Sequence, residues 1–337
     1  MVRSPVTLIK PQWMLLILAP LLVVSPIFAI AIGSAQLEFS TVISAIKTLL
    51  SAAEPSSIGE RIVIELRFPR VLMAMICGAG LAVCGSVLQS ITRNPLADPY
   101  LFGISSGASL GAVIALTIGL GTIGLPVAAF AGALIAVMVV MVMARDGRIE
   151  GLILAGVAIS FLLGSLANLV LYFSEAQAIQ AVLFWTMGSF ARAGWGDLGI
   201  PALILLVALI VIAHQQRALM ALMAGDESAH TQGVAVQPLR LGMLLLTALL
   251  TATLVANCGG IGFVGLMVPH IVRMLIGSGG VIGILVTAIT GALLMVWVDL
   301  LARWLLPSQE LPVGVVTAIL GSVFFLGLLI KRRGERR

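Results

Sequence analysis

Long apolar runs constrain this chain more than any other feature. Apolar residues occupy 60% of the 337 positions before the 36 glycines are counted, whereas soluble domains reach about 45–50% with glycine included. That share is about 202 residues, enough for roughly ten helices of the ~20 residues that cross a bilayer. Only 10% of residues are charged, well below the ~25% of a soluble domain. The chain is therefore predicted to be an all-α, polytopic membrane protein.

Ten apolar stretches are bounded by proline, glycine or charged residues. They lie at about 13–32, 70–92, 101–119, 124–143, 150–173, 198–213, 239–257, 264–276, 280–303 and 312–330. The first exceeds the ~7–15 residue core of a cleaved signal peptide, so we expect it to remain as a span. The run at 264–276 is too short to cross alone, and such helices are tolerated only among neighbours or beside a cavity. This pattern favours a translocator over a simple anchor.

The basic residues divide unevenly between the two sides of this topology. With the N-terminus inside, 13 of the 19 Lys and Arg lie on the inner side and 6 on the outer side. The positive-inside rule then predicts that both termini are cytoplasmic. The net charge of +5 follows from this topology, so it does not indicate nucleic-acid binding. The six outer residues are Lys47, Arg61, Arg67, Arg70, Arg192 and Arg303.

The order of the spans suggests an internal repeat. Spans two to five and spans seven to ten form two groups of four, joined by span six. Corresponding spans are five apart, an odd number, so the two groups have opposite orientations. Inverted repeats of this kind are a common plan for transporters.

Several functional classes are excluded by what the sequence lacks. None of the three lysines follows the G-x-x-x-x-G of a phosphate-binding loop, and the three histidines form no H-E-x-x-H zinc motif. Cys77, Cys84 and Cys258 lie in apolar runs and are interpreted as small hydrophobic residues. Since no paired catalytic groups are present, we predict neither an enzyme nor a bound metal or cofactor.

A stiff turn at 94–99 follows the second span. Pro95 and Pro99 cannot continue a helix, so the span must end here. One face of the next run carries a glycine at every fourth position, at Gly103, Gly107 and Gly111. Such a face lets another backbone approach closely, and helix packing alone explains these glycines. The turn itself is a candidate for part of a closable constriction.

The segment Gly260–Gly265 formally matches G-x-G-x-x-G. A dinucleotide site also needs a preceding strand and an acidic residue about 20 positions later, and the sequence offers neither. We therefore predict a tight turn between helices here. His270, on the short run that follows, is interpreted as a packing residue.

Residues 214–238 form the one long polar stretch on the inner side. Gly225 and Gly233 bracket a segment that begins with Asp226 and Glu227, residue types that stabilise a helix N-terminus. A solvated loop is the simplest explanation, but the other inner loops are very short. A polar helix here therefore indicates a docking surface for a cytoplasmic partner.

Charged residues near outer span ends leave two interpretations open. Asp299 and Arg303 have the four-residue spacing of an intrahelical ion pair. Charged residues inside a membrane mark a functional site. At the end of a span they can instead extend to the lipid headgroups. Arg67 and Arg70 have only the acidic residues of segment 60–65 nearby. Arginines without a partner in their own chain fit recognition of an acidic protein, because a guanidinium pairs bidentately with carboxylate.

Together these segments resemble the FecCD/BtuC-type permeases, the membrane subunits of type II ABC importers for iron-siderophore, haem and cobalamin. The resemblance covers the chain from about residue 60 to its end. It rests on LRFPR (66–70), RNPLADPYLFGISSGASLGA (93–112), LILAGVAI (152–159), FWTMGSF (184–190), GDESAHTQGV (225–234), GGIGFVGLMVPHIVRMLIG (259–277) and QELPVGVVTAILGSVFFLGLL (309–329).

The resemblance implies a BtuC-like fold of ten spans, with 1–337 as one permease domain and 214–238 as its cytoplasmic coupling segment. It also implies a homodimer in the bacterial inner membrane, with the pathway between the copies. The expected partners are two cytoplasmic ATPase subunits, which hold ATP and Mg, and a periplasmic binding protein. No cofactor is expected in this chain, and its remaining contacts are with membrane lipid.

The same resemblance assigns roles to individual residues. Arg67, Arg70 and Arg303 match the outer arginines that pair with glutamates on the binding protein, and Asn94 and Leu96 match the cytoplasmic gate. The residues that match the coupling helix on the ATPase are Gly225, Asp226, Glu227, Ala229 and Gly233. Ile149 and Glu150 stand where the family often carries small hydroxyl residues, so no second gate is assigned. Arg192 receives no role.

Import of a bulky metal chelate is the leading functional hypothesis. Iron-siderophore is first on family frequency, with haem and cobalamin as alternatives. An ion-coupled secondary transporter is the alternative from another class. Such carriers place ion ligands at the membrane midplane, whereas the span centres here are nearly free of charge.

Overall fold

The computed structural model describes residues 9–33, 37–51, 53–144, 149–277, 279–306 and 309–334. Within these ranges the regular structure is helical, without strands. The helices are α1 (Pro11–Ala31), α2 (Phe39–Leu50), α3 (Ile58–Arg61), α4 (Phe68–Thr92), α5 (Ile104–Thr117), α6 (Gly121–Met143), α7 (Ile149–Tyr172), α8 (Ala176–Thr186), α9 (Trp195–His214), α10 (Gln216–Met223), α11 (Asp226–Thr231), α12 (Val236–Cys258), α13 (Val264–Ile276), α14 (Gly280–Trp304) and α15 (Val313–Gly334).

Each of the ten predicted spans corresponds to a helix. Eight helical segments of the described chain are long and apolar enough to cross a membrane, whereas α5 and α13 have only 14 and 13 residues. The predicted start of the second span was wrong. A π-helical turn at Ile62–Arg67 joins α3 to α4, so this helix begins at Ile58 instead of about residue 70. Arg67 and Arg70 therefore lie on a helix.

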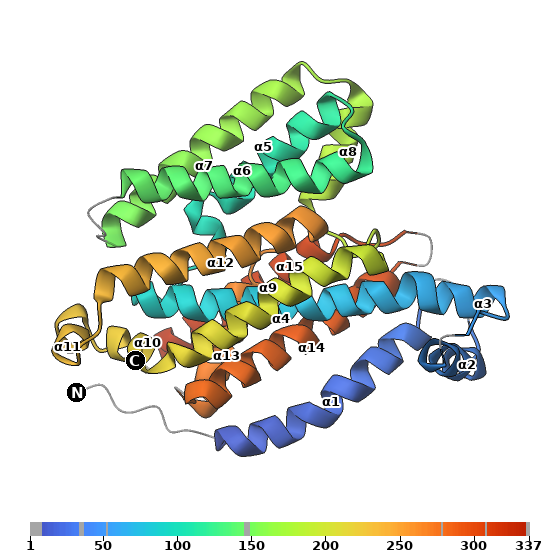
Figure 1. The fold of residues 1–337 in the computed structure, drawn as a ribbon, viewed down its shortest axis with the longest axis horizontal. Coiled ribbons are helices and arrows are strands. Elements are labelled where there is room, and N and C mark those ends of the chain that lie inside the picture. The colour runs from blue at the N-terminus through green and yellow to red at the C-terminus, as the bar shows by residue number, and fades with distance from the viewer. Residues whose placement is uncertain are drawn as a thin grey trace.

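Helix α4 forms the centre of the bundle. Most of its residues are buried, and it packs against α9, α12, α13 and α14 (Figure 1). A Cβ atom on Gly78 or Gly291 would collide with the carbonyl oxygen of the other, so α4 and α14 meet backbone to backbone. The predicted packing role of Gly107 is confirmed in the same way against Gly132 of α6.

The two groups of four spans form an inverted repeat, as predicted. Helices α4 to α7 contain 25, 14, 23 and 24 residues, and α12 to α15 contain 23, 13, 25 and 22. The short helix of each group follows a left-handed residue, Gly103 (φ 77°) before α5 and Phe263 (φ 69°) before α13. Helix α4 runs toward the end of the bundle that carries α11, and α12 runs away from it (Figure 1).

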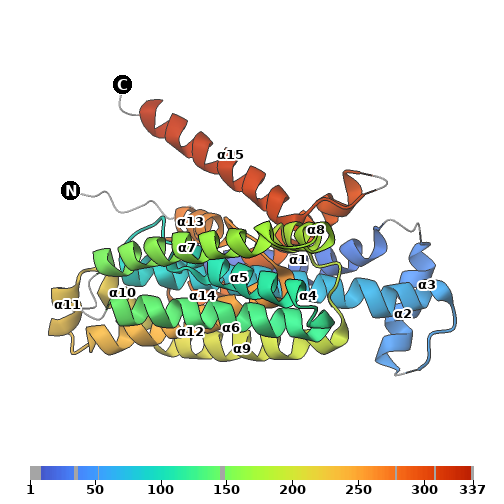
Figure 2. The same ribbon diagram turned by 90° about the horizontal axis from the view of Figure 1, so that it is seen from above.

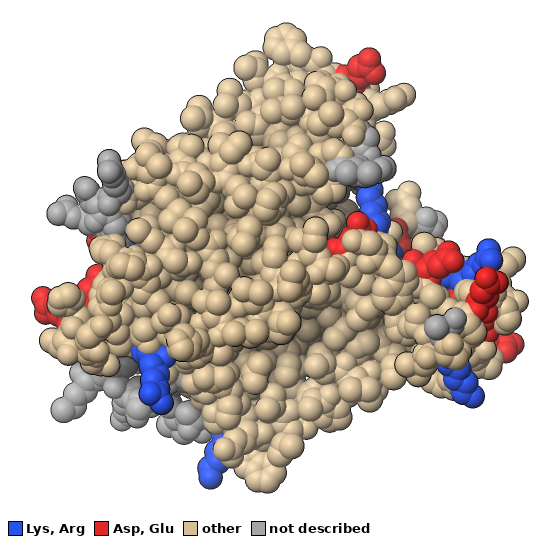
Figure 3. Space-filling model, in the orientation of Figure 1, with Lys and Arg blue, Asp and Glu red and all other residues tan. Residues whose placement is uncertain are grey.

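The bundle has two polar ends and an apolar middle. On the face drawn in Figure 3, charged side chains gather toward the two ends of the long axis, and the band between them has none. Helices α2 and α3 mark one end, here called the α3 end. Helices α10 and α11 mark the other, the α11 end, where α1 starts and α15 finishes (Figure 1). Among the described residues, the predicted outer and inner charges thus lie at opposite ends.

Candidate functional site

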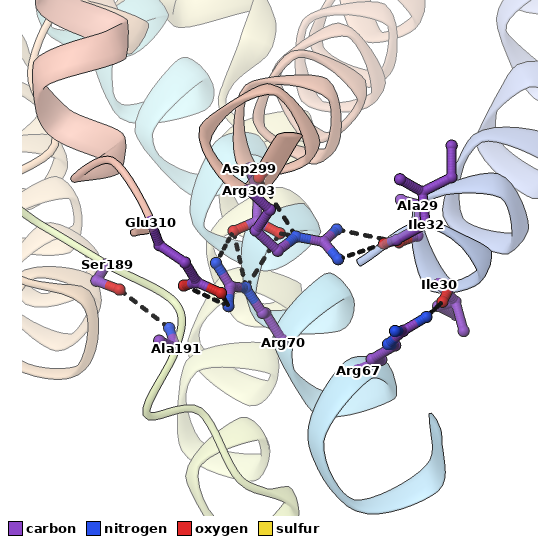
Figure 4. A network of polar contacts seen from close by, with 10 residues as sticks. All are labelled: Ala29, Ile30, Ile32, Arg67, Arg70, Ser189, Ala191, Asp299, Arg303 and Glu310. Carbon is purple, nitrogen blue, oxygen red and sulfur yellow. Dashed lines mark hydrogen bonds and ion pairs between the residues drawn. The ribbon is translucent and has the colours of Figure 1, made fainter. Parts of the chain in front are cut away.

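An ion-pair network lies at the α3 end, where α4 meets α14 (Figure 4). The Arg70 guanidinium pairs with the Asp299 carboxylate at 2.9 Å and with the Glu310 carboxylate at 2.9 Å. Asp299 also pairs with Arg303 at 3.0 Å, which confirms the predicted intrahelical pair. Because the Asp299 side chain is fully buried, the alternative in which this pair reaches the headgroups is wrong. We call these four residues the outer cluster.

Arg67 and Arg303 hold the end of α1. Arg67 donates to the carbonyl oxygens of Ile30 and Ala31 at 2.7 and 3.0 Å. Arg303 donates to those of Ile32 and Ala29 at 2.7 and 3.0 Å (Figure 4). The last carbonyls of a helix lack intrahelical donors and carry its negative dipole end, so they attract cations. The two arginines therefore fasten α1 to α4 and α14.

The interpretation of Arg67 and Arg70 as unpartnered in their own chain was wrong. Arg67 and Arg303 are 6% and 8% exposed, and the side chain of Arg70 is 11% exposed. The acidic partners also differ from those expected. Glu60 accepts hydrogen bonds from Ser44 and Ser56, while Arg70 takes its partners from α14 and the segment after it.

The predicted gate residues occupy a tight turn at the α11 end of α4. Arg93 closes α4 in a left-handed conformation (φ 50°). The side chain of Asn94 accepts a hydrogen bond from the Leu96 backbone at 2.9 Å, which stiffens the turn. Leu96 is 58% exposed, so an apolar side chain projects from the tip. We call residues 93–99 the gate turn.

The gate turn is anchored to the turn between α12 and α13. The Tyr100 hydroxyl donates to the Ile261 carbonyl at 3.0 Å and accepts from the Ile261 amide at 2.9 Å. Asp98 Oδ1 accepts from the Tyr100 amide at 2.9 Å, while its Oδ2 is buried with no hydrogen-bond partner among the described residues. Burial raises the pKa of Asp98 from 3.8 to about 6, although the bond from Tyr100 opposes the shift.

A second ion-pair group joins α11 to the gate turn. Asp226, the first residue of α11, pairs with Arg240 of α12 at 3.0 Å and with Arg93 at 3.4 Å. Arg240 is 2% exposed, and its Nε donates to the carbonyl of Ile91 at the end of α4. The carboxylate of Asp226 therefore pairs with one arginine of the gate turn and with one arginine of α12. We call Arg93, Asp226 and Arg240 the Asp226 hub.

The other predicted coupling residues divide between the surface and the interior. Gly225 (φ 123°) and Gly233 (φ 78°) bracket α11 in conformations that favour glycine. Glu227 is exposed, whereas Ala229 is fully buried and packs α11 onto the bundle. A partner at this end would therefore meet Glu227 and not Ala229.

The remaining candidate motifs are structural. Residues 259–263 form the predicted tight turn between α12 and α13, and Val264 and Gly265 already begin α13. His270 packs against the rings of Phe324 and Phe325, with centroids 5.9 and 6.2 Å away. The three cysteines are buried and free, as predicted. Residues 145–148, beside the unassigned second gate, lie outside the described residues, and Glu150 is exposed at the start of α7. Arg192 is also exposed.

The comparison with protein families decides the class of this molecule. The model of the FecCD transport family matches residues 21–331. The chain belongs to the FecCD transport family. It is accordingly a transmembrane permease subunit of the ABC importers, in which ATP hydrolysis resides on a separate subunit.

Individual relatives cover nearly the whole chain. The hemin transport system permease protein HmuU of Yersinia pestis is 37% identical over 97% of this chain and 98% of its own length. The Fe(3+) dicitrate transport system permease protein FecD of Escherichia coli is 41% identical over 81% of this chain and 86% of its own. A metal-chelate type ABC transporter solved in an inward-facing conformation superposes with TM-score 0.84 at 31% identity, over 95% and 99% of the two chains.

Proposed function

We propose that this permease subunit imports a bulky metal chelate, with iron-siderophore as the first candidate and haem or cobalamin as the alternatives. Relatives named for hemin, Fe(3+) dicitrate and vitamin B12 support the class of cargo. The observation that carries the mechanism is the Asp226 hub, because it joins α11 to the gate turn. Movement of α11 by a nucleotide-driven partner would reach Arg93 through ion pairs instead of through a flexible loop.

The proposed assembly contains a second copy of this chain, two ATPase subunits at the α11 end and a binding protein at the α3 end. Both termini then face the cytoplasm of a bacterial inner membrane. The excess of Lys and Arg on the predicted inner side supports this orientation. The start of α1 and the finish of α15 lie together with α11, as the orientation requires (Figure 1).

We propose separate tasks for the three outer arginines in docking of the binding protein. Arg70 would meet a glutamate of that protein, which would compete with Glu310 for the guanidinium. The Glu310 side chain is 39% exposed, so the pair lies at the surface. Arg67 and Arg303 would not contact the binding protein; they would keep this surface in place by holding α1 against α4 and α14.

The variant Glu310→Gln tests this docking arrangement. It removes the competing carboxylate while Asp299 still holds Arg70, so affinity for the binding protein should rise about threefold or more. Titration of the binding protein onto permease in nanodiscs measures the change. The matched control is Glu175→Gln, at an exposed residue directly before α8. Unchanged or weaker docking of Glu310→Gln would show that Arg70 does not receive the partner.

Reconstitution tests the proposed transport function. Proteoliposomes containing the permease and its ATPase, supplied with the cognate binding protein, should accumulate one of three cargoes: a ferric siderophore, haemin or cobalamin. Uptake should require ATP hydrolysis. Uptake that persists without the ATPase would establish a secondary transporter instead.

A further inference from the structure

A groove opens at the α11 end between the α9–α10 and α13–α14 pairs, with α4 as its floor. It encloses a cavity of about 60 Å³. Most of its wall is apolar, formed by Val83, Val87, Ile212, Leu219, Met220, Val272 and Ile284. Ser86, Ser90 and Gln216 add a few polar groups. In Figure 1 the elements that build this wall converge beside α10.

A second hollow, with two arginines in its wall and here called the polar hollow, continues the groove. It holds about 160 Å³ and is lined by Gln89, Arg93, Pro95, Met223 and Arg273. Met223 and Arg273 also line the apolar part, so the two spaces adjoin. Since one water needs about 10–15 Å³ by such a measure, the hollow has room for a phosphodiester group. The groove is therefore amphiphilic, with Arg273 where the two spaces join and Arg93 in the polar hollow.

Arg273 differs from three other arginines that lie inside the bundle. Arg70, Arg240 and Arg303 each pair with an aspartate. Arg273 bonds to the side-chain oxygen of Gln89, whose amide group donates to the Gly265 carbonyl at 3.0 Å. No carboxylate pairs with Arg273 among the described residues. A positioned guanidinium with a neutral partner leaves the hollow with an uncompensated positive charge.

We propose that this groove binds an anionic phospholipid, with its phosphate on Arg273 and one acyl chain along the apolar wall. Arginine recognises phosphate through parallel N–H···O bonds. Basic pockets between membrane helices on the cytoplasmic side bind anionic headgroups. The apolar wall next to Arg273 favours a lipid over a small soluble anion, which would leave that wall in contact with water.

The position of the groove gives the lipid access to the coupling elements. Arg93 lines the polar hollow and also belongs to the Asp226 hub. Met223 is the last residue of α10, three positions before α11. A phosphate in the hollow would share Arg93 with Asp226. Lipid binding would therefore affect the Arg93–Asp226 ion pair that joins α11 to the gate turn.

Lipid binding to the full-length permease tests the proposal without any transport assay. Delipidated protein is titrated with phosphatidylglycerol or phosphatidylcholine, and bound lipid is counted by native mass spectrometry. Wild type should retain phosphatidylglycerol about tenfold better than phosphatidylcholine. Arg273→Gln should remove this preference and Arg273→Lys should keep part of it. Arg217→Gln, at an exposed arginine of α10, should leave the preference unchanged.

A groove-filling variant separates a lipid from a small anion. Met220 is 43% exposed, so Met220→Trp can fill the apolar part without disturbing the core. It should reduce phosphatidylglycerol binding as strongly as Arg273→Gln does, with an unchanged melting temperature. The proposal is overturned if phosphatidylglycerol and phosphatidylcholine bind equally or if Arg273→Gln has no effect. Insensitivity to Met220→Trp, or complete displacement of the lipid by inorganic phosphate, would overturn it too.

Discussion

One buried carboxylate neutralises two arginines from different helices at the α3 end. Asp299 lies within 3.0 Å of both Arg70 and Arg303, and its side chain is fully buried. A buried ion pair gains little over an apolar contact, but removing one partner leaves an unpaired charge that costs about 3–5 kcal/mol. Asp299 is thus the residue on which the stability of the outer cluster depends.

The variant Asp299→Asn should therefore lower the stability of the permease by about 3–5 kcal/mol. Asparagine keeps the shape and one acceptor oxygen but cannot neutralise Arg70 and Arg303. Thermal unfolding in detergent micelles measures the loss as a drop of several degrees. Glu310→Gln, which removes the exposed partner of Arg70, should cost at most about 1 kcal/mol. Equal melting temperatures for the two variants would contradict the dependence on Asp299.

Asp98 makes the stability of the gate turn depend on pH. Its folded pKa of about 6 lies above the ordinary 3.8, so the folded state binds more protons than the unfolded state between these values. Stability then falls as the pH rises through this window and stays low above it. The difference between 3.8 and about 6 corresponds to at most about 3 kcal/mol.

The variant Asp98→Asn should remove this dependence, because the amide oxygen can still accept from the Tyr100 backbone. It should match wild type near pH 4 and melt several degrees higher above pH 7, as measured by a pH series of thermal melts. Glu227→Gln, at an exposed carboxylate, serves as the control and should follow wild type. A difference between Asp98→Asn and wild type that stays constant with pH would exclude this role.

At the scale of elements, α11 is tied to α4 and α12 through its first residue. Asp226 reaches Arg240 and Arg93, whereas Glu227, the next residue, is exposed. These adjacent carboxylates therefore have different tasks. In the proposed mechanism, Asp226 transmits motion within the permease and Glu227 contacts the ATPase.

The variant Asp226→Asn should keep ATPase binding but reduce cargo moved per ATP hydrolysed by about tenfold. It leaves Arg240 and Arg93 without the carboxylate that joins them to α11. Glu227→Lys should do the reverse and weaken ATPase association in pull-down assays. Paired measurements of uptake, hydrolysis and association distinguish the two. If Asp226→Asn loses the ATPase as readily as Glu227→Lys does, the hub is part of the docking surface.

At the scale of the whole molecule, α15 leaves the bundle. Figure 2 shows it diverging from the neighbouring helices toward the α11 end. Large apolar side chains on it are exposed, among them Val323 (64%), Leu326 (59%) and Ile330 (72%). In the proposed homodimer the second copy covers this helix.

Cysteine cross-linking tests that arrangement. Val323→Cys should form a dimer with a short bifunctional thiol reagent in membranes. Leu203 is similarly exposed at 61% and belongs to α9, a helix on the opposite side of the bundle from α15 (Figure 2). Leu203→Cys should therefore remain monomeric. The native cysteines are buried, so they should not react. Cross-linking at Leu203 but not at Val323 would place the dimer interface elsewhere.

Local sequence patterns predicted the elements of this fold but not its long-range pairings. The ten spans, the turn at 94–99 and the Asp299–Arg303 pair follow from apolar runs, prolines and helical spacing within a few residues. Arg70 and Asp299 are 229 positions apart, so only packing of α4 on α14 could reveal their contact. The prediction that Arg67 and Arg70 lack partners in their own chain was wrong for this reason. Distance along the sequence does not show which residues meet across a helix bundle.

The attachment of α1 has a consequence for biogenesis. The Arg303 donor lies 271 positions after the Ile32 carbonyl that accepts from it. At roughly 5–20 residues per second of synthesis, the first span, which Arg67 can hold soon after it is made, waits on the order of 15–50 seconds for this second attachment. A nascent chain that stalls before α14 would therefore carry a first helix held by Arg67 without Arg303, giving quality-control proteases a means to tell unfinished copies from complete ones.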